Sequence, residues 1–288
     1  MKNLICCFDG NYASIADTPF SPLTFSLHYG VGVFEGVRSY QTAKGTHIFR
    51  LEDHTKRLFR GAALLGLSIP FTETELNEMQ RDVVALNSLG DAYIRPLVFL
   101  GAGSMSLDIH QNQVHIFVGA WPWTNLHADK EHGIHLKTVP LRKLATNSTH
   151  IQAKAIGHYL NSGIALHQAK TLGGDEALLL DQAGFVCEGS GQNLFFVKDH
   201  ILHTPTTDTA LEGITRDTVI QLAHHHHIEV KIGHYSLEEL KCADEIFLTG
   251  TATEIAKVSQ LDNQKIGLGV SPITTLLQAA FHQVCRTI

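Results

Sequence analysis

The sequence predicts an α+β protein of two domains, a small α/β sandwich-like domain followed by a larger domain with a β-barrel-like core and flanking helices. Three observations support this prediction. The chain has 288 residues, which is long for a single hydrophobic core and sufficient for two domains. Short apolar stretches typical of strands outnumber the amphipathic stretches typical of helices. A polar, turn-rich segment, WPWTNLHADKEHG (121–133), separates two regions of regular pattern.

The first third of the chain alternates strand-like and turn-like sequence, and two helical segments interrupt it. In LEDHTKRLFRGAALLGL, apolar residues recur at three- and four-residue steps, and TETELNEMQRDVVALNSLG has the acidic start and glycine stop of a helix. The strand-like segments are NLICCFDG, VGVFEG, GTHIFR, AYIRPLVFLG and NQVHIFVGAW. We therefore expect a small N-terminal domain (1–122) with a mostly antiparallel sheet, followed by an interdomain linker (123–133).

Residues 134–288 are expected to form the larger C-terminal domain. Its predicted helices lie at about 155–171, in ITRDTVIQLAHHH, and from Pro272 to near the C-terminus. The remaining apolar segments are short and separated by tight turns, which favours a β-barrel-like core. These predicted strands are IHLKTVPL, EALLLD, FVCEG, NLFFVKD, ILHTP and EIFLTG.

Composition argues against several classes of protein and indicates a cytoplasmic chain. The net charge of −6 and the pI near 6.3 do not fit a nucleic-acid-binding surface, which would be basic. No apolar run approaches a membrane span, and MKNLICCFDG becomes polar too early for a signal peptide. An odd, unpatterned set of cysteines is then typical of free thiols in a reducing compartment. They are Cys6, Cys7, Cys187, Cys242 and Cys285.

Four of the nineteen histidines are consecutive, His224 to His227. Such a run is able to bind a metal ion. It also ends an apolar-periodic helix just before the strand-like IEVKI, and partial positive charge suits a helix C-terminus because of the helix dipole. We therefore expect a polar helix end here and no metal cofactor.

Lys154 is the only permanently charged residue in IQAKAIGHYL (151–160), where it stands between two alanines. Burying an ammonium without a partner is costly. The side chain therefore either reaches water or serves where water is scarce, as a base or a nucleophile.

Three other features suit an anion. Gly213, Ile214 and Thr215 open a predicted helix in EGITRDTV, where N–H groups and the dipole favour phosphate. The turn in LTGTATEI offers amides and hydroxyls, and Arg50 closes a strand with a permanent cation. Taken singly, each also fits an ordinary helix cap or a surface arginine. The sequence has no dinucleotide-binding and no P-loop motif, so a dinucleotide or a nucleoside triphosphate is not expected as ligand. The GxSxG and HExxH motifs are also absent.

The carboxylate of Glu188, in CEGSGQNLF, completes a set of three parts. A buried lysine, a phosphate cradle and an isolated acid are what pyridoxal 5'-phosphate requires. The lysine forms the Schiff base, the cradle holds the phosphate, and the acid holds the proton on the pyridine nitrogen. This combination of residues suits pyridoxal 5'-phosphate.

Seven motifs occur in the order and spacing of branched-chain amino acid aminotransferases, the fold-type IV pyridoxal-phosphate enzymes. The resemblance runs from about Phe8 to the final helix. The motifs are SLHYGVGVFEGVRSY, FRLEDHTKRL, AYIRPLVF, AKAIGHYLNS, EGSGQNLF, LEGITRDTVI and TGTATEI. By this resemblance the chain is expected to be a transferase that binds pyridoxal 5'-phosphate and serves amino-acid biosynthesis or breakdown.

The resemblance also implies roles for individual residues. Lys154 resembles the Schiff-base lysine that moves the proton between substrate Cα and the cofactor. Glu188 matches the partner of the pyridine nitrogen, Tyr159 the partner of the phenolic oxygen, and Leu211 a leucine packed on the ring. The residues that resemble phosphate ligands are Arg50, Ile214, Thr215 and Thr251.

On the substrate side, the resemblance implies a carboxylate site and an apolar pocket. The α-carboxylate would be received by Tyr93, Thr251 and the Ala252 amide, with Arg38 supporting Tyr93. Arg95 matches an arginine that admits the side-chain carboxylate of glutamate. Residues that resemble the pocket walls are Phe34, Tyr29 and Tyr159, together with Met105 and Leu107. In the family, Tyr29, Met105 and Leu107 reach the site from the partner subunit, so an active homodimer is expected, and its further assembly is left open.

Three departures from the family pattern are visible. Gln192 stands where glutamate is common, and Glu212 where proline is common; neither is an expected cofactor contact. A tyrosine that often follows the PW pair is replaced by Asn125, Leu126 and His127, which leaves the efficiency of glutamate as amino donor open.

The resemblance implies reversible ping-pong transamination of L-leucine, L-isoleucine and L-valine with 2-oxoglutarate. Sister activities on the same fold are D-amino acid transamination, (R)-amine transamination and 4-amino-4-deoxychorismate lysis. HYG..VFEG.R followed by YIRP favours the L-branched-chain group over these. A metal-binding or storage protein built on the histidine run is the rival from another class, and it leaves the cofactor motifs unexplained.

Overall fold

The structure is a computed structural model, and it describes residues 3–124, 126–127, 130, 132–267 and 269–287. Cα proximity divides the chain into two compact units. Unit 1 comprises Met1–Thr124, Ala153–Gly157 and Cys285–Ile288, and unit 2 comprises Asn125–Gln152 and His158–Val284. Part of the predicted linker lies outside the described residues. The segment that carries Lys154 belongs to unit 1, although the chain on both sides of it belongs to unit 2.

Unit 1 is a sheet with two helices on one face. Its described strands follow the order β2-β1-β7-β6-β4-β5, with β3 beside β6, and each pair is antiparallel. This confirms the predicted small α/β domain with an antiparallel sheet. The strands are β1 (Ile5–Phe8), β2 (Asn11–Ser14), β3 (Gly32–Phe34), β4 (Val37–Thr42), β5 (Gly45–Ile48), β6 (Ala92–Leu100) and β7 (Val114–Pro122).

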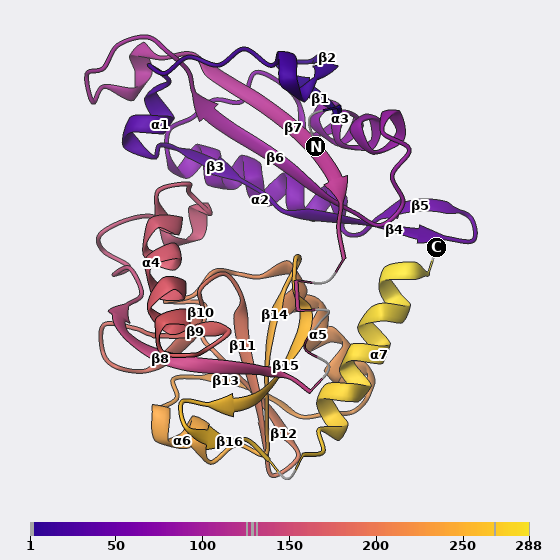
Figure 1. The fold of residues 1–288 in the computed structure, drawn as a ribbon, viewed down its shortest axis with the longest axis vertical. Coiled ribbons are helices and arrows are strands. Elements are labelled where there is room, and N and C mark those ends of the chain that lie inside the picture. The colour runs from indigo at the N-terminus through magenta and orange to yellow at the C-terminus, as the bar shows by residue number, and fades with distance from the viewer. Residues whose placement is uncertain (1–2, 125, 128–129, 131, 268, 288) are drawn as a thin grey trace. The chain divides into compact units, whose positions relative to one another are not determined.

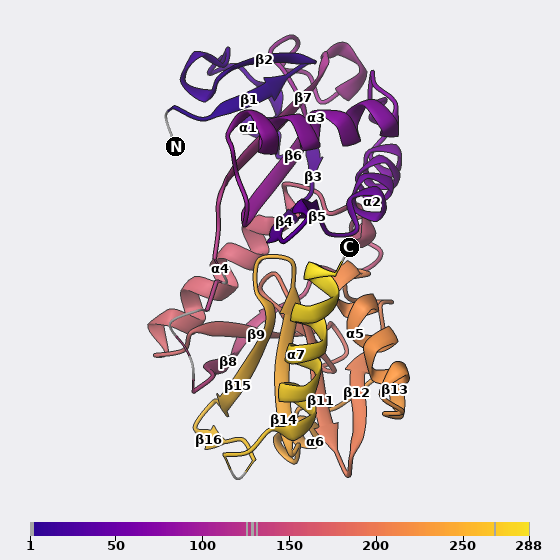
Figure 2. The ribbon, with the colours of Figure 1, turned by 90° about the vertical axis from the view of Figure 1, so that its right-hand side faces the viewer.

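The longer helices of unit 1 are α2 (Leu51–Leu64) and α3 (Glu73–Leu86), and α1 (Phe25–Tyr29) is a single short turn. Figures 1 and 2 show α2 and α3 lying together against the sheet. Thr72 and Glu75 form a capping box that satisfies the first N–H groups of α3. Helix α3 packs on β1, β6 and β7, and α2 packs on β3 and on α3. Burial of their apolar side chains is the main stabilising term for this unit. Short 3-10 turns lie at Ile15–Asp17 and Ile109–Gln111.

Unit 2 is built on a closed barrel. The strand order β10-β9-β8-β15-β14-β11 closes because β10 also pairs with β11, and β12 and β13 extend the sheet from β11. This confirms the predicted β-barrel-like core. The described strands are β8 (Ile134–Arg142), β9 (Glu176–Leu180), β10 (Val186–Gly189), β11 (Asn193–Lys198), β12 (Ile201–Pro205), β13 (Val230–Gly233), β14 (Glu245–Gly250), β15 (Glu254–Leu261) and β16 (Gln264–Lys265).

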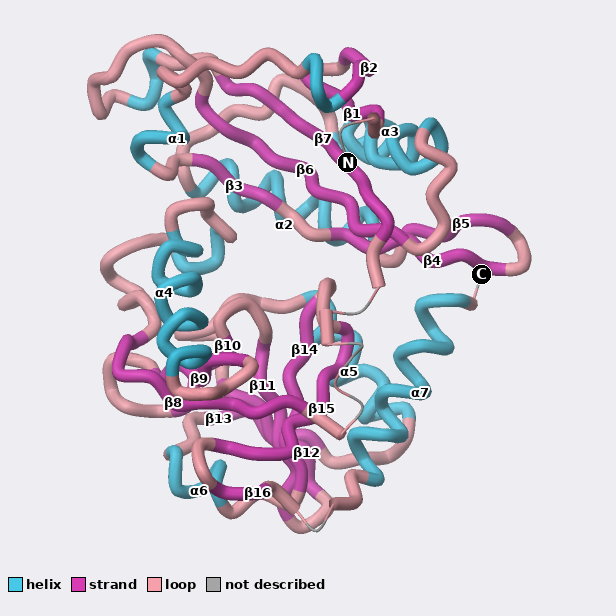
Figure 3. Tube along the Cα trace, viewed as in Figure 1, coloured by secondary structure: helices cyan, strands magenta, loops and turns pink. Residues whose placement is uncertain are grey.

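The helices of unit 2 lie outside the strands, as the cyan segments of Figure 3 show. Ala165 and Ala169 of α4 pack on β8 and β9, and the side chain of Glu245 accepts from the first N–H groups of α7. No helix among the described residues has the length and apolar character needed to cross a membrane. These helices are α4 (His158–Thr171), α5 (Ile214–His225), α6 (Leu237–Lys241) and α7 (Pro272–Arg286).

Two sequence expectations can be compared directly with this geometry. The helix expected from about 155 begins only at His158, because the amides of Ile156 and Gly157 are bonded to the carbonyls of Gly32 and Gly30. The histidine run ends α5 as expected, with His226 as its C-cap.

Candidate active site

The Lys154 segment is anchored to an edge of the unit 1 sheet. Ala155 forms an antiparallel bridge with Val33, and the Phe34 amide donates to the Lys154 carbonyl at 3.3 Å. Lys154 itself has a φ of +46°, the left-handed region that non-glycine residues rarely adopt. Such conformations concentrate at functional sites, where surrounding bonds hold them in place. The backbone therefore fixes where the lysine side chain starts.

The side chain of Lys154 lies against an aromatic ring. Its ammonium is 5.0 Å from the centroid of Phe34, and the Arg95 guanidinium is 4.5 Å from that same centroid. Arg95 also donates to the Tyr93 hydroxyl at 3.0 Å. Its Nε is buried and has no hydrogen-bond partner among the described residues. Unit 1 therefore brings Lys154, Phe34, Tyr93 and Arg95 together, with one buried donor still to be satisfied.

A buried ion cluster supports this part of unit 1 and was not predicted from the sequence. The Glu35 carboxylate accepts from Arg57 at 2.6 and 2.9 Å and pairs with His54 at 2.8 Å. Burial alone would raise the pKa of Glu35, but Arg57 and His54 outweigh it and hold that pKa well below its ordinary value. Burial lowers the pKa of His54. Because Glu35 follows Phe34 directly, the cluster fixes the backbone beside Lys154.

Arg38 and Arg50 lie on neighbouring parts of the same sheet. Arg38 is buried opposite Tyr93 in the β4–β6 register, with its guanidinium 5.0 Å from the Tyr40 ring. Arg50 precedes α2 in a left-handed conformation, and its Nε bonds Asp53 at 2.6 Å.

Tyr29, Met105 and Leu107 gather at a different, exposed place on unit 1. The Tyr29 hydroxyl donates to the Met105 carbonyl at 3.1 Å, and Leu107 is 74% exposed. Tyr29 and Met105 are 42% and 37% exposed, so all three candidates lie at the surface of this chain.

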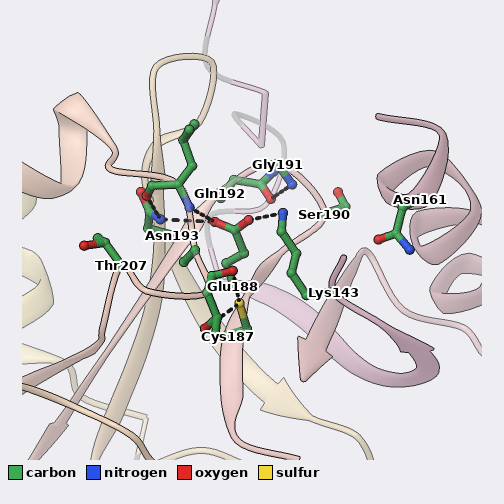
Figure 4. Close-up of polar contacts among 12 residues, drawn as sticks. Lys143, Asn161, Cys187, Glu188, Ser190, Gly191, Gln192, Asn193 and Thr207 are labelled. Carbon is green, nitrogen blue, oxygen red and sulfur yellow. Dashed lines mark hydrogen bonds and ion pairs between the residues drawn. The ribbon is translucent and has the colours of Figure 1, made fainter. Parts of the chain in front are cut away.

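In unit 2, Glu188 is held from two sides, as Figure 4 shows. The Lys143 ammonium pairs with one carboxylate oxygen, Oε1. The Asn193 amide and the Leu211 amide donate to the other, Oε2, at 3.2 and 3.3 Å. Glu188 and Asn193 are opposite each other across the β10–β11 hairpin, and both are buried.

Two of the three features expected to hold an anion lie near Asn193, whereas Arg50 belongs to unit 1. Its side chain donates to the Leu211 carbonyl, just before α5, and its backbone pairs with Thr249 at the end of β14. Gly213 caps α5, and a Cβ there would come within 1.9 Å of the Asn193 Oδ1, so only glycine allows this approach. The α5 start with Ile214 and Thr215, and the turn with Thr251 and Ala252, therefore lie at one end of the barrel.

Tyr159 and two of the departures from the family pattern also belong to unit 2. Tyr159 is part-buried in the first turn of α4. Gln192 is buried and donates to Glu176 at 2.9 Å, so this departure from the family pattern serves the hairpin turn. The Leu126 amide donates to the Ala252 carbonyl at 3.0 Å, whereas Asn125 lies outside the described residues.

The residues present fit pyridoxal phosphate by the chemistry of their donor sets. Unit 1 supplies a primary amine on an anchored backbone. Unit 2 supplies an oriented carboxylate and, beside it, a helix N-terminus capped by glycine, which suits phosphate. A metal centre has no comparable support, since no group of His, Cys, Asp and Glu among the described residues is arranged to hold an ion.

The sequence matches the class IV amino-transferase family over residues 32–261. It is 41% identical to the branched-chain-amino-acid aminotransferase of Pseudomonas aeruginosa, over 96% of this chain and 91% of that protein. It is 39% identical to that of Escherichia coli, over 95% and 90%. The fold superimposes on the T.th. branched-chain amino acid aminotransferase with pyridoxamine 5'-phosphate, with a TM-score of 0.96, 38% identity and coverage of 99% and 95%. The chain therefore belongs to the class IV aminotransferases and, among them, to the branched-chain amino acid aminotransferases.

Sequence reasoning missed two pairs of residues: Glu35 and Arg57 near Lys154 in unit 1, and Lys143 and Asn193 beside Glu188 in unit 2. Asn193 lies five residues after Glu188 across a glycine-containing turn, and hairpin pairing could have suggested it. Lys143 follows a strand and is adjacent to Arg142, a pattern that also fits an exposed strand end. Its burial depends on strand order, which local sequence does not encode.

Proposed function

We propose that this chain is a pyridoxal-phosphate-dependent transaminase that exchanges the amino group of L-leucine, L-isoleucine or L-valine with 2-oxoglutarate by a reversible ping-pong reaction. The observation that carries the proposal is the setting of Lys154, whose amine starts from a backbone fixed by β3 and lies beside Phe34 and the incompletely bonded Arg95. Relatives at 39–41% identity, which carry the branched-chain name, support the choice of substrate class.

Pyridoxal phosphate, when bound, supplies an aldehyde that condenses with amines and a ring that withdraws electrons from substrate Cα. Lys154 is proposed to hold the aldehyde carbon at rest and then to take and return the Cα proton. An amine suits both tasks because it is a nucleophile and a base. Glu188 is proposed to hold the ring-nitrogen proton, since its carboxylate is already oriented by Asn193 and Leu211.

The remaining cofactor contacts are proposed from unit 2 and from Arg50. The amides and hydroxyl at the start of α5, from Ile214 and Thr215, would hold phosphate with Thr251 and Arg50. Tyr159 would donate to the phenolic oxygen, and Leu211 would exclude water from one ring face.

The substrate residues are proposed to act through one carboxylate site and one apolar pocket. Tyr93, Thr251 and the Ala252 amide would bind the α-carboxylate, with Arg38 orienting Tyr93. Phe34, Tyr29 and Tyr159 would form apolar walls. Arg95 would bind the distal carboxylate of glutamate, because the buried Nε of its guanidinium has an unmet N–H and gains most from an anion.

The test is an absorbance titration of the purified protein. Near-visible absorbance should fall on addition of L-leucine and return on addition of 2-oxoglutarate, since each half-reaction changes the state of the cofactor. Faster turnover of D-alanine than of L-leucine would instead support a D-amino acid transaminase. Protein that reconstitutes with pyridoxal phosphate but responds to neither amino acid would contradict the proposal.

A homodimer with shared active sites is proposed from the exposed apolar surface of unit 1. Phe20, Leu27 and Leu107 are 71, 62 and 74% exposed, and a groove of about 570 Å³ lies beside Phe20 and Leu27. A surface of this kind is usually covered by another chain. Light scattering of the eluted protein should give a mass of at least twice 31.7 kDa.

We also propose a cytoplasmic location and the domain boundaries 1–122, 123–133 and 134–288. The buried free cysteines Cys6, Cys7 and Cys187 suit a reducing compartment. The change of unit after Thr124 supports the first boundary, and limited proteolysis within 123–133 would test it.

A further inference from the structure

Lys143 is a buried cation whose position is set by its backbone. It follows β8, its amide donates to the Leu180 carbonyl at 2.9 Å, and its own carbonyl accepts from Gln182 at 2.7 Å. The Lys143 side chain is 16% exposed and pairs with Glu188, whose side chain is 6% exposed. A flexible surface lysine would show neither the two backbone anchors nor this burial.

Burial disfavours charge on Lys143, but the Glu188 carboxylate outweighs it and raises the pKa of the ammonium above its ordinary value. Lys143 is therefore charged near neutral pH, and its ammonium lies against the Glu188 carboxylate. A buried carboxylate that loses its cation either costs free energy or takes up a proton. Asn193 and Leu211 would remain as neutral donors to Oε2 only.

We propose that Lys143 is a positioning residue that keeps Glu188 ionised and oriented before the cofactor binds, so that the carboxylate is ready for the protonated ring nitrogen. This inference rests on the proposed function, because it assumes that Glu188 meets the pyridine ring. Lys143 itself is proposed to touch neither substrate nor cofactor.

The proposed role of Lys143 makes cofactor affinity depend on pH in a different way with and without this lysine. If Lys143 keeps Glu188 ionised, the cofactor brings the only proton that the pair of ring nitrogen and carboxylate shares. If removing Lys143 lets the carboxylate take up a proton, that proton must leave when a protonated ring binds. Binding of a protonated ring then releases one proton to solvent, so affinity must fall as pH falls.

Other titratable groups near the pair do not supply this proton. Burial, reinforced by Glu188, raises the pKa of Cys187 to about 12, so its thiol stays neutral. Burial and Lys143 lower the pKa of His158, which favours the neutral ring. Tyr159 also faces Lys143, and Asp181 faces Cys187.

The experiment measures the Kd of pyridoxamine 5'-phosphate for apoprotein between pH 6.5 and 9, in wild type and in Lys143→Met, Lys143→Gln and Lys143→Arg. This form of the cofactor has no aldehyde, so Lys154 chemistry does not contribute. Lys198→Met is the matched control, since Lys198 is a half-exposed lysine of the same unit paired with Asp244. Circular dichroism of each apoprotein identifies variants that fold.

We expect the Kd of Lys143→Met and Lys143→Gln, relative to wild type, to rise as pH falls, by up to about tenfold per pH unit for one released proton. Lys143→Arg should keep the wild-type profile because the charge is retained, and so should the control. A ratio that is independent of pH in a folded neutral variant would overturn the inference while leaving the transaminase proposal intact. Wild-type protein that binds neither form of the cofactor would overturn both.

Discussion

The amide of Phe34 donates to the carbonyl of Lys154, and the Lys154 ammonium lies 5.0 Å from the Phe34 ring. Phe34, a single residue of β3, thus contacts both the backbone and the side-chain ammonium of Lys154. Because the two contacts act on different parts of Lys154, substitutions can separate them.

Replacing Lys154 by alanine should abolish turnover and the near-visible absorbance that stays with the protein after free pyridoxal phosphate is removed, because the amine proposed to bind the aldehyde is lost. Lys170→Ala, an exposed lysine near the end of α4, is the matched control and should behave as wild type. Measurable wild-type turnover in Lys154→Ala would remove the proposed role.

Gly61→Ala tests the support beneath the lysine. A Cβ on Gly61 would come within 2.4 Å of the Ala153 carbonyl oxygen, a backbone atom next to Lys154, so that segment must shift. We expect kcat to fall about tenfold or more, as positional errors near 1 Å are costly.

Gly163→Ala, in helix α4, provides the comparison for Gly61→Ala. Nothing lies within 4 Å of its added Cβ, so alanine should stabilise the chain by about 0.5–1 kcal/mol and leave kcat unchanged. Urea unfolding and initial rates measure the two effects. Equal kcat values for the two alanine variants would show that the Ala153 contact does not position Lys154.

Arg95→Met should impair glutamate selectively. A charge-assisted bond to the distal carboxylate contributes about 1.5–3 kcal/mol, so kcat/KM for L-glutamate should fall about 10- to 100-fold. L-Leucine has no such carboxylate, and its kcat/KM should change by less than about threefold. For L-glutamate, the kcat/KM of Arg95→Lys should lie between those of the wild type and of Arg95→Met. Equal losses for both amino acids would indicate that Arg95 acts only through its bond to Tyr93.

Glu35→Gln should destabilise the protein by about 3–5 kcal/mol at pH 7, because Arg57 then remains buried without its counter-ion. The pKa of Glu35 is lowered in the folded state, so its contribution is complete above the unfolded value of about 4.3 and is lost as pH falls below it. The wild-type and variant free energies of unfolding should therefore converge toward acid pH. A difference that stays constant as the pH falls from about 5 to about 2.5 would contradict this account.

Local sequence was sufficient for much of the fold. The apolar spacing of Leu51, Leu58 and Ala62 predicted α2, and the Thr72 and Glu75 pair lies at the start of α3, as its acidic first turn suggested. Local sequence was insufficient where a distant segment of the chain forms hydrogen bonds with the same backbone groups. Residues 155–157 have helical sequence, yet Ala155 is bridged to Val33 and the N–H groups of Ile156 and Gly157 bond to Gly32 and Gly30, so α4 starts later.

Local sequence likewise predicted some residues of the candidate site and not others. Lys154 and Glu188 were identified as chemical groups because each stands alone among apolar or small neighbours, a property that spacing reveals. The pairing of Glu188 with Lys143 could not be predicted, since 45 residues separate them and either could have faced water.

By itself, the sequence determined the kinds of element, their caps and the chemical groups available, because these depend on periodicity and on neighbours a few residues apart. Tertiary structure alone decided that the Lys154 segment joins β3, that β10 closes the barrel on β11, and that Lys143 is buried against Glu188. Each of these contacts joins chain segments brought together by strand order, and their free energy is gained only once the whole sheet has formed.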